Sequence, residues 1–235
     1  MRTVLRSALL ALTITSTAAF AQSANPSFHG DIHQLEANVL ATLNVARAQP
    51  NVYVETLMTY RGYFKANLVV IPGQTIDVQT QEGTVPVDEA VDFLSTHPTL
   101  ETLQPSETLR LAAADHVAEQ SRTGKTGHFG ADGSGPSDRT LKHGGGKQVA
   151  EVIAYGAVDA EDVIRQLIID DGVSDRGHRI LMFADHLRYA GVACGPHPEF
   201  GTMCVIDMGD TPDAKPGGPV RRVQVAAMDE TKPKQ

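Results

Sequence analysis

The sequence predicts a mixed α+β fold in one domain. Apolar residues recur at helical spacing through most of the chain between residues 32 and 183, whereas short β-rich runs flank a turn-rich loop from residue 189 onward. Helices that come first and a hairpin that comes last favour a layered α+β arrangement over a doubly wound parallel sheet. We find no internal repeat and no sign of a second domain.

The first residues have the pattern of a secretory signal peptide. Two early arginines precede a short apolar run at residues 8–14, and a small-x-small cleavage motif ends at Ala21. The run is too short for a permanent membrane anchor. We therefore expect a signal peptide at residues 1–21, a leader at residues 22–30, no integral membrane segment after cleavage, and a secreted or periplasmic protein.

The charge balance argues against nucleic acid as a partner. The chain has 28 acidic and 20 basic side chains, and cleavage of the signal peptide would remove two of the arginines. An acidic surface repels phosphate backbones and anionic lipid, and no cluster of lysine and arginine is present.

Two cysteines, Cys194 and Cys204, are expected to form a disulfide, because an exported protein meets an oxidising environment. The segment between them is rich in glycine and proline. Strand-like runs flank it at residues 189–193 and 203–208, so the bond should clamp a hairpin. A redox role is the sharper alternative, but no C-x-x-C motif is present.

Helices are expected at seven places, with a strand at residues 149–155. The helical segments are residues 32–48, 52–60, 87–94, 106–121, 136–142, 160–169 and 176–183. Their predicted N-caps include Asp31, Ser106 and Asp159, and Gly124 should close the fourth helix. Residues 62–84 are interpreted as an insertion or extended arm. The domain should span residues 31–210, followed by a disordered tail at residues 211–235 because apolar residues become scarce there.

No standard catalytic motif is present: H-E-x-x-H, G-x-S-x-G and phosphate-binding glycine loops are all absent. What remains is His128 in a glycine-rich loop, Glu151 within an apolar strand, His178, and two acids that end a helix, Asp170 and Asp171. A carboxylate in such a strand must face solvent, pair with a cation, or join a polar site. Imidazole with carboxylate suits both divalent metals and acid–base catalysis. The spacing alone leaves a shared site and scattered surface groups as alternatives.

Several stretches resemble, in order, the bacterial branch of the CAP superfamily (cysteine-rich secretory proteins, antigen 5, pathogenesis-related 1). Residues 44–50 fit N-x-x-R-x-x-P, and the glycine-rich stretch at residues 127–134 resembles the segment with the first family histidine. Residues 150–156, A-E-V-I-A-Y-G, are similar to G-E-N-I-A-Y-G, and residues 167–179 resemble the bacterial form of the last segment. The resemblance implies a three-layer α-β-α sandwich with a central antiparallel sheet.

The resemblance also implies a cavity with two histidines and two acids that can take zinc or another divalent cation. By position, His128 and His178 would be the histidines and metal ligands, and Glu151 the first acid. The second acid would be Asp170 or Asp171. The sequence departs from the family pattern where valine replaces the asparagine after Glu151 and where the second acid is aspartate.

Three functions follow as hypotheses. The first is a non-catalytic binding module with an acidic, histidine-lined cleft for a divalent metal or a small extracellular ligand such as a lipid, peptide or wall-derived molecule. The second is a hydrolase, peptidase-like, with Glu151 as general base; whether the chain is an enzyme stays open. The third is a purely structural polar cluster.

The remaining basic side chains have simpler interpretations. We expect His116 to pack or hydrogen-bond within its helix, and loop histidines at positions 143, 186 and 197 to be solvated. Three arginines, at positions 139, 176 and 179, could form structural ion pairs with the acids at the end of the helix before His178.

Overall fold

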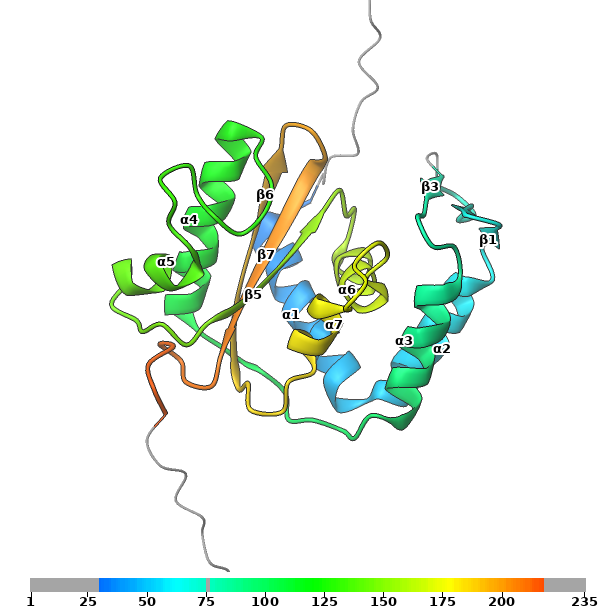
Figure 1. Cartoon of the computed structure of the whole chain (residues 1–235), viewed down its shortest axis with the longest axis horizontal. Coiled ribbons are helices and arrows are strands. Elements are labelled where there is room, and N and C mark those ends of the chain that lie inside the picture. Colours follow the sequence, from blue (N-terminus) through cyan, green and yellow to red (C-terminus); the bar gives the residue numbers. More distant parts are fainter. Residues whose placement is uncertain (1–29, 75–76, 218–235) are drawn as a thin grey trace, which may run out of the picture.

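The computed structural model describes residues 30–74 and 77–217, and shows a four-stranded sheet between two helical layers (Figure 1). In chain order the elements are α1 (Ile32–Ala48), α2 (Pro50–Arg61), β1 (Phe64–Lys65), β2 (Leu68–Val69), β3 (Val78–Gln79), α3 (Val85–Thr96), β4 (Gln104–Pro105), α4 (Glu107–Thr123), α5 (Pro136–Lys142), β5 (Ala150–Tyr155), α6 (Ala160–Ile169), α7 (Gly177–Met182), β6 (Tyr189–His197) and β7 (Gly201–Gly209). Helices α4 and α5 cover one face of the sheet, and α1, α6 and α7 cover the other. The predicted three-layer α-β-α sandwich is confirmed.

The sheet has the order β4-β6-β7-β5, and its three long strands are antiparallel. Only the two-residue strand β4 pairs in parallel, at one edge. Strand β5 forms the other edge and is the strand that carries Glu151. The central antiparallel sheet is therefore confirmed, and the position of β5 leaves its outer edge available to form the wall of a site.

The hairpin of β6 and β7 is longer than expected, although its disulfide is confirmed. Cys194 and Cys204 lie directly opposite each other and are bonded. Pairing continues beyond them to His197 and Gly201, so only three residues form the turn. The turn-rich composition of these outer residues predicts a loop, whereas continuous strand pairing satisfies their backbone groups.

Local capping signals predicted the helix boundaries well. The side chain of Asp31 accepts a hydrogen bond from the amide of His33, and that of Ser106 accepts from Leu109. Gly124 ends α4 in the left-handed conformation, with φ of 67°. These caps depend on neighbours within four residues, so they can be recognised in the sequence.

Two side chains of the first motif anchor α1 to distant loops. Asn44 exchanges two hydrogen bonds with the backbone of Leu103, at 2.7 and 2.9 Å. Arg47 is fully buried and donates to four backbone carbonyls: that of Glu101 before β4, that of Met182 at the end of α7, and those of Ala184 and Leu187 in the loop that follows. Burial lowers the pKa of Arg47 to about 10, with Arg188 contributing, so the side chain remains charged at neutral pH.

The sheet divides the apolar core in two. The larger part lies between the sheet and α1, α3 and α6, and includes Leu43, Leu94, Ile164 and Ile206. The smaller part faces α4 and includes Ile153. Alternation along β5 thus sends Val152 and Ala154 to the larger core, while Glu151 lies on the same face as Ile153.

Residues 62–74 and 77–84, called the arm below, contain the three short strands β1, β2 and β3. They pair antiparallel in that order and extend from the ends of α2 and α3, away from the main sheet (Figure 1). The β-like insertion predicted here is therefore present. Of its described residues only Val69 and Gly83 are buried, so the arm has little core of its own.

The C-terminal boundary differs from the prediction. Residues 211–217, which the sequence assigns to a disordered tail, lie against the domain. The carbonyls of Asp213 and Ala214 accept hydrogen bonds from the amides of Gly146 and Gln148, and Ala214 is fully buried. Backbone pairing holds this segment despite its polar composition. The predicted signal peptide, the leader up to residue 29, and residues 218–235 lie outside the described residues.

Candidate functional site

A cavity of about 660 Å³ lies along the outer edge of β5, between that strand, α6, the α6–α7 turn and the arm. Its lining is a mixture of aromatic, aliphatic and polar side chains: Tyr60, Phe64, Val78, Gln79, Thr80, Gln81, Gly83, Ile153, Ala154, Tyr155, Gly156, Asp162, Arg165, Gln166, Leu167, Ile169, Asp170, Asp171, Val173, His178 and Phe200. The volume is that of a site for a small organic ligand.

One carboxylate–histidine pair lines this cavity. Asp170 ends α6 in the left-handed conformation, with φ of 60°, and its carboxylate turns toward the first turn of α7. There it accepts hydrogen bonds from the backbone amide of His178 at 2.9 Å and from its ring nitrogen Nδ1 at 2.6 Å. Because an ionised carboxylate only accepts, Nδ1 carries the proton, and Nε2 is left as an acceptor.

Asp171 has a different task from its neighbour. Its two carboxylate oxygens accept hydrogen bonds from the backbone amides of Gln81 and Glu82 in the arm, at 2.7 and 2.9 Å. Both acids line the cavity, but only Asp170 contacts His178. Of the two acids that the sequence left as alternatives, Asp170 is thus the partner of His178, and Asp171 is a contact to the arm.

The second pair, His128 with Glu151, belongs to the α4–α5 face. Nδ1 of His128 lies 2.9 Å from Oε1 of Glu151, and Arg139 donates to the other carboxylate oxygen at 2.5 Å. The Glu151 side chain is 1% exposed and that of His128 is 43% exposed. Burial opposes ionisation of Glu151, but the hydrogen bond from His128 and the charge of Arg139 outweigh it and lower the pKa of Glu151 overall.

Asp207 is a buried acid that the sequence reasoning missed. It lies opposite Glu151 in the register of β5 and β7 and is fully buried. Within the described part of the chain, neither of its carboxylate oxygens makes an ordinary hydrogen bond. Burial raises the pKa of Asp207 well above its usual range, and the nearby Glu151 raises it further, against the partial opposition of Arg139. The signal was an aspartate inside an apolar strand, the same signal that pointed to Glu151.

A hydrogen-bond network around Gly127, the residue before His128, holds the glycine-rich loop in place. The hydroxyl of Tyr155 donates to Gln120 at 2.8 Å and accepts from the amide of Gly127 at 3.0 Å. The carbonyl of Gly127 lies 2.8 Å from Nε2 of His116, which is fully buried. His116 therefore packs and hydrogen-bonds within the domain, as expected.

The loop histidines are less solvated than the sequence suggested. His197 is buried, and its ring packs against those of Tyr155 and Phe200, because β6 continues further than predicted. His143 lies 3.0 Å from Asp115 and is 21% exposed, whereas His186 is 69% exposed and remains solvated.

The arginines also have partners other than those expected. Arg139 pairs with Glu151, and Arg176 pairs with Glu82 and Glu89. Arg179 donates mainly to backbone carbonyls, and Arg176 reaches only the carbonyl of Asp170, not its carboxylate.

The two histidines and two acids of the expected site do not assemble into one metal centre. They form two separate pairs, and the cavity is lined by His178, Asp170 and Asp171 but not by His128 or Glu151. Across residues 30–74 and 77–217, no group of three or more His, Cys, Asp or Glu side chains is placed to hold a metal ion. Arg139 already neutralises Glu151. The residues therefore do not fit the shared zinc site that the resemblance implies.

These observations define the class of protein as a three-layer α-β-α domain that carries two separate carboxylate–histidine pairs. Comparison with family models then finds that residues 96–208 match the cysteine-rich secretory protein family, CAP. Through this segment the chain belongs to the CAP superfamily. The match begins at the end of α3, so α1, α2 and the arm lie outside it.

Two solved structures are similar at low identity. An outer surface protein from Borrelia burgdorferi has a TM-score of 0.39 and 15% identity, over 46% of this chain and 77% of that one. An extracellular protein containing an SCP domain from Bacillus anthracis has a TM-score of 0.40 and 15% identity, over 51% of this chain and 36% of that one. No curated protein sequence matches the chain significantly.

Proposed function

We propose that this chain is a non-catalytic, extracytoplasmic binding protein whose cavity takes a small, uncharged ligand with a largely apolar body. The observation that carries the proposal is the cavity of about 660 Å³ at the edge of β5. Aromatic and aliphatic side chains such as Phe64, Leu167 and Phe200 supply its apolar walls. Such a site gains its affinity from burial of apolar surface, with a few polar groups fixing orientation.

The charges around the cavity disfavour an anionic ligand. Asp162, Asp170 and Asp171 line it, while the guanidinium of Arg165 is already committed to Asp162 at 2.6 Å and stacks 4.3 Å from the ring centroid of Tyr60. A carboxylate or phosphate group would enter a negative field without a cation left to receive it.

His178 supplies a polar contact for orientation. Its Nδ1–H is held by Asp170, which leaves Nε2 as an acceptor, and the side chain is 25% exposed. A hydroxyl or amide group on the ligand is the complementary donor. The proposed ligand is therefore an apolar molecule with one or a few neutral polar groups.

An extracytoplasmic location fits several features. The early residues have a signal-peptide pattern, and the Cys194–Cys204 disulfide requires an oxidising compartment to persist. Among the described residues, no helix combines the length and apolar character needed to cross a membrane.

The proposal can be tested with two fluorescent probes that share the same phenylaminonaphthalene core. N-phenyl-1-naphthylamine is neutral and apolar, and 1-anilinonaphthalene-8-sulfonate adds an anionic group. We expect the neutral probe to bind with enhanced fluorescence and the sulfonate to bind at least about tenfold more weakly. Equal binding of both probes, or binding of neither, would contradict the proposed site.

Two variants test whether the neutral probe binds within the cavity. Gln166→Trp adds bulk to a residue of α6 that lines the cavity, and Val52→Trp adds the same bulk to a half-exposed position of α2 outside the cavity lining. We expect Gln166→Trp to weaken binding of the neutral probe by about tenfold and Val52→Trp to leave it unchanged. Equal effects of the two variants would place the probe elsewhere.

The hydrolase alternative receives less support from the geometry. Glu151 is almost fully buried, and both of its carboxylate oxygens are already engaged, by His128 and Arg139. A general base must reach the water that it activates. Turnover of peptide or ester substrates that disappears in Glu151→Gln, but persists in His186→Ala, would restore this alternative.

A further inference from the structure

The arm forms a large part of one cavity wall. It contributes Phe64, residues 78–81 and Gly83 to the lining, while β5, α6 and the α6–α7 turn form the opposite wall. The arm and the α6–α7 turn therefore face each other across the cavity.

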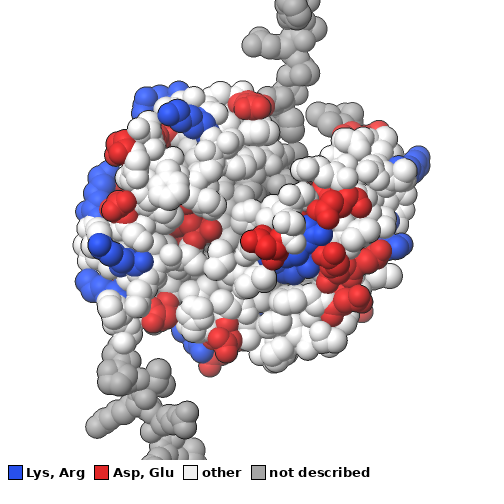
Figure 2. Space-filling view, viewed as in Figure 1, with Lys and Arg blue, Asp and Glu red and all other residues white. Residues whose placement is uncertain are grey.

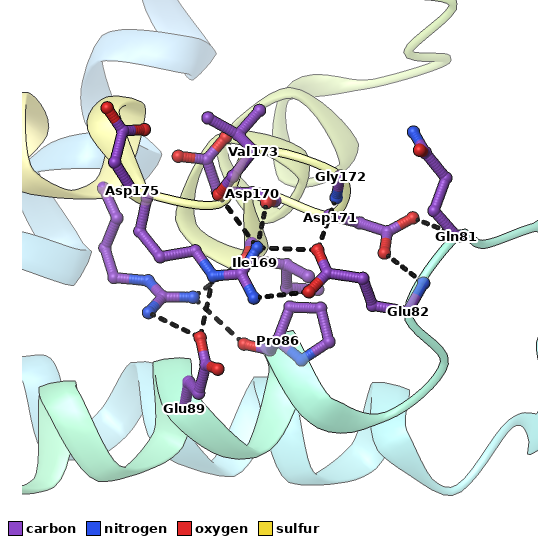
Figure 3. Close-up of polar contacts among 12 residues, drawn as sticks. Gln81, Glu82, Pro86, Glu89, Ile169, Asp170, Asp171, Gly172, Val173 and Asp175 are labelled. Carbon is purple, nitrogen blue, oxygen red and sulfur yellow. Dashed lines mark hydrogen bonds and ion pairs between the residues drawn. The ribbon is translucent and has the colours of Figure 1, made fainter.

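A reciprocal set of polar contacts holds the two walls together (Figure 3). From the turn, Asp171 accepts the amides of Gln81 and Glu82 in the arm. From the arm, Glu82 accepts the amide of Gly172 in the turn at 2.7 Å. Each segment thus supplies a carboxylate to the backbone of the other. We call this set of contacts, together with Arg176, the clasp.

Arg176 is the cation at the centre of the clasp. Its Nη1 and Nη2 atoms reach the two carboxylate oxygens of Glu82, at 2.7 and 2.8 Å, and its Nε reaches Glu89 of α3 at 2.7 Å. It also donates to the carbonyls of Asp170 and Val173, both at 2.9 Å. These bonds tie the guanidinium to the turn on one side and to the arm on the other.

The clasp is polar, and it lies at a charged surface. Figure 2 shows acidic side chains gathered around a small basic group on this face. The Glu82 side chain is 34% exposed and that of Glu89 is 45% exposed. Since few arm residues are buried, little apolar burial opposes separation of the arm. Segments held mainly by partly exposed polar bonds open at a small fraction of the free energy of global unfolding.

We propose that the arm is a gate over the cavity and that the clasp of Glu82, Asp171 and Arg176 controls how often it opens. This inference rests on the proposed ligand-binding function, since it assigns a means of regulating entry to that cavity. It gives Asp171 the role of a gate residue, whereas Asp170 serves the ligand site. Rising ionic strength should weaken the Glu82–Arg176 pair and speed entry.

The test compares Glu82→Gln and Asp171→Asn with Glu89→Gln. The first two remove charge from the contacts between arm and turn. The third removes a carboxylate that also touches Arg176 but comes from α3, so it leaves the arm contacts in place. Hydrogen exchange of the peptide containing residues 81–82 reports opening without any ligand. Stopped-flow mixing with N-phenyl-1-naphthylamine reports the association and dissociation rates.

We expect exchange at residues 81–82 and both probe rates to rise by about fivefold or more in the two clasp variants, and to change little in Glu89→Gln. High salt should accelerate probe entry into the wild-type chain but not into Glu82→Gln. Unchanged exchange in the clasp variants would overturn the clasp. Faster exchange with unchanged probe rates would overturn the gate.

The two proposals fail in different ways. If the wild-type chain does not bind the probe at equilibrium, the proposed function fails, while hydrogen exchange still decides whether the clasp holds the arm. Thermal melts of all three variants check that any change is local. A large fall in the melting temperature of a clasp variant, alongside its faster exchange, would indicate global destabilisation and count against the gate.

Discussion

At the scale of single residues, four acids of the domain lie in four different electrostatic situations. Asp170 orients a histidine, Asp171 binds backbone amides, Glu151 is balanced by an arginine, and Asp207 has no balancing partner of its own. Two adjacent buried carboxyl groups with a single guanidinium nearby, bonded to Glu151, cannot both ionise at low cost. Asp207 is therefore the group that holds a proton.

Replacing Asp207 with asparagine should stabilise the protein at neutral pH. The folded-state pKa of Asp207 is raised, so folding above its unfolded-state pKa requires the carboxyl to keep a proton or bury a charge, and the free energy of unfolding falls as pH rises until the folded-state pKa is passed. Asparagine avoids this cost. We expect Asp207→Asn to gain more than about 1.4 kcal/mol at pH 7, the equivalent of one pKa unit.

Urea denaturation at several pH values measures this difference. The gain should shrink toward zero as the pH approaches about 4, where unfolded aspartate takes up its proton. Asp185→Asn, at a side chain that is 88% exposed, serves as the control and should show no such trend. A variant that is less stable than the wild type at neutral pH would show that Asp207 carries a needed charge.

Arg47 is the other residue whose burial has a large predicted effect. Replacing it with leucine leaves four backbone carbonyls without their donor, at a cost of about 3–5 kcal/mol. Arg122→Leu, at an exposed position of α4, should change the stability by less than about 0.5 kcal/mol. Chemical denaturation of both variants compares them, and similar small losses would mean that water replaces the lost donor.

At the scale of elements, the hairpin and the arm differ in how they are stabilised. The hairpin has nine residues in each strand, a disulfide, and packing on both faces. The arm has strands of two residues each and few buried side chains. The hairpin is thus more firmly held than the arm, and β5, which pairs with β7 of the hairpin, forms part of the cavity wall opposite the arm.

Removal of the disulfide should weaken the hairpin without changing the fold. The bond closes a short span of ten residues, so a double Cys194→Ser and Cys204→Ser variant should lose about 2–3 kcal/mol. Thermal denaturation in the presence and absence of a reductant measures the loss. The reductant should lower the melting temperature of the wild type and leave that of the variant unchanged; equal sensitivity would point to an effect other than the disulfide.

Element prediction succeeded where the signals were local. Caps at Asp31 and Ser106 and the apolar period of α6 depend on residues close in sequence. The ends of β6 and β7 were predicted less well, because pairing between strands, not their own glycine and proline content, decides how far they extend. The packed segment 211–217 was missed for the same reason, since its partners lie in the 146–148 segment.

At the scale of the whole molecule, the fold places one carboxylate–histidine pair, Asp170 with His178, at the cavity. The other pair, Glu151 with His128, lies on the face of the sheet that α4 and α5 cover. The sequence predicted His128, Glu151, His178 and one of two acids as members of a single site, whereas the structure places them in two separate pairs. Zinc added to the purified chain should therefore give no increase in melting temperature, because ligand binding to the native state is what would raise it.

Elemental analysis of the purified chain accompanies that titration. Stoichiometric zinc, or a rise of several degrees that vanishes in both His128→Ala and His178→Ala, would restore the shared metal site. His186→Ala provides the matched control, because its imidazole is solvated and lies outside both pairs.

The amino-acid sequence by itself determined the fold class, most helices, the disulfide, the family resemblance and three of the four residues of the two pairs: His128, Glu151 and His178. These rest on periodicity, on capping and on short motifs, which are properties of neighbours along the chain. Only the tertiary structure decided that Asp170 and not Asp171 contacts His178, that Asp207 lies beside Glu151, and that the arm lines a cavity. Each of these depends on side chains brought together from distant segments, and their burial and pairing energies exist only after the layers have packed.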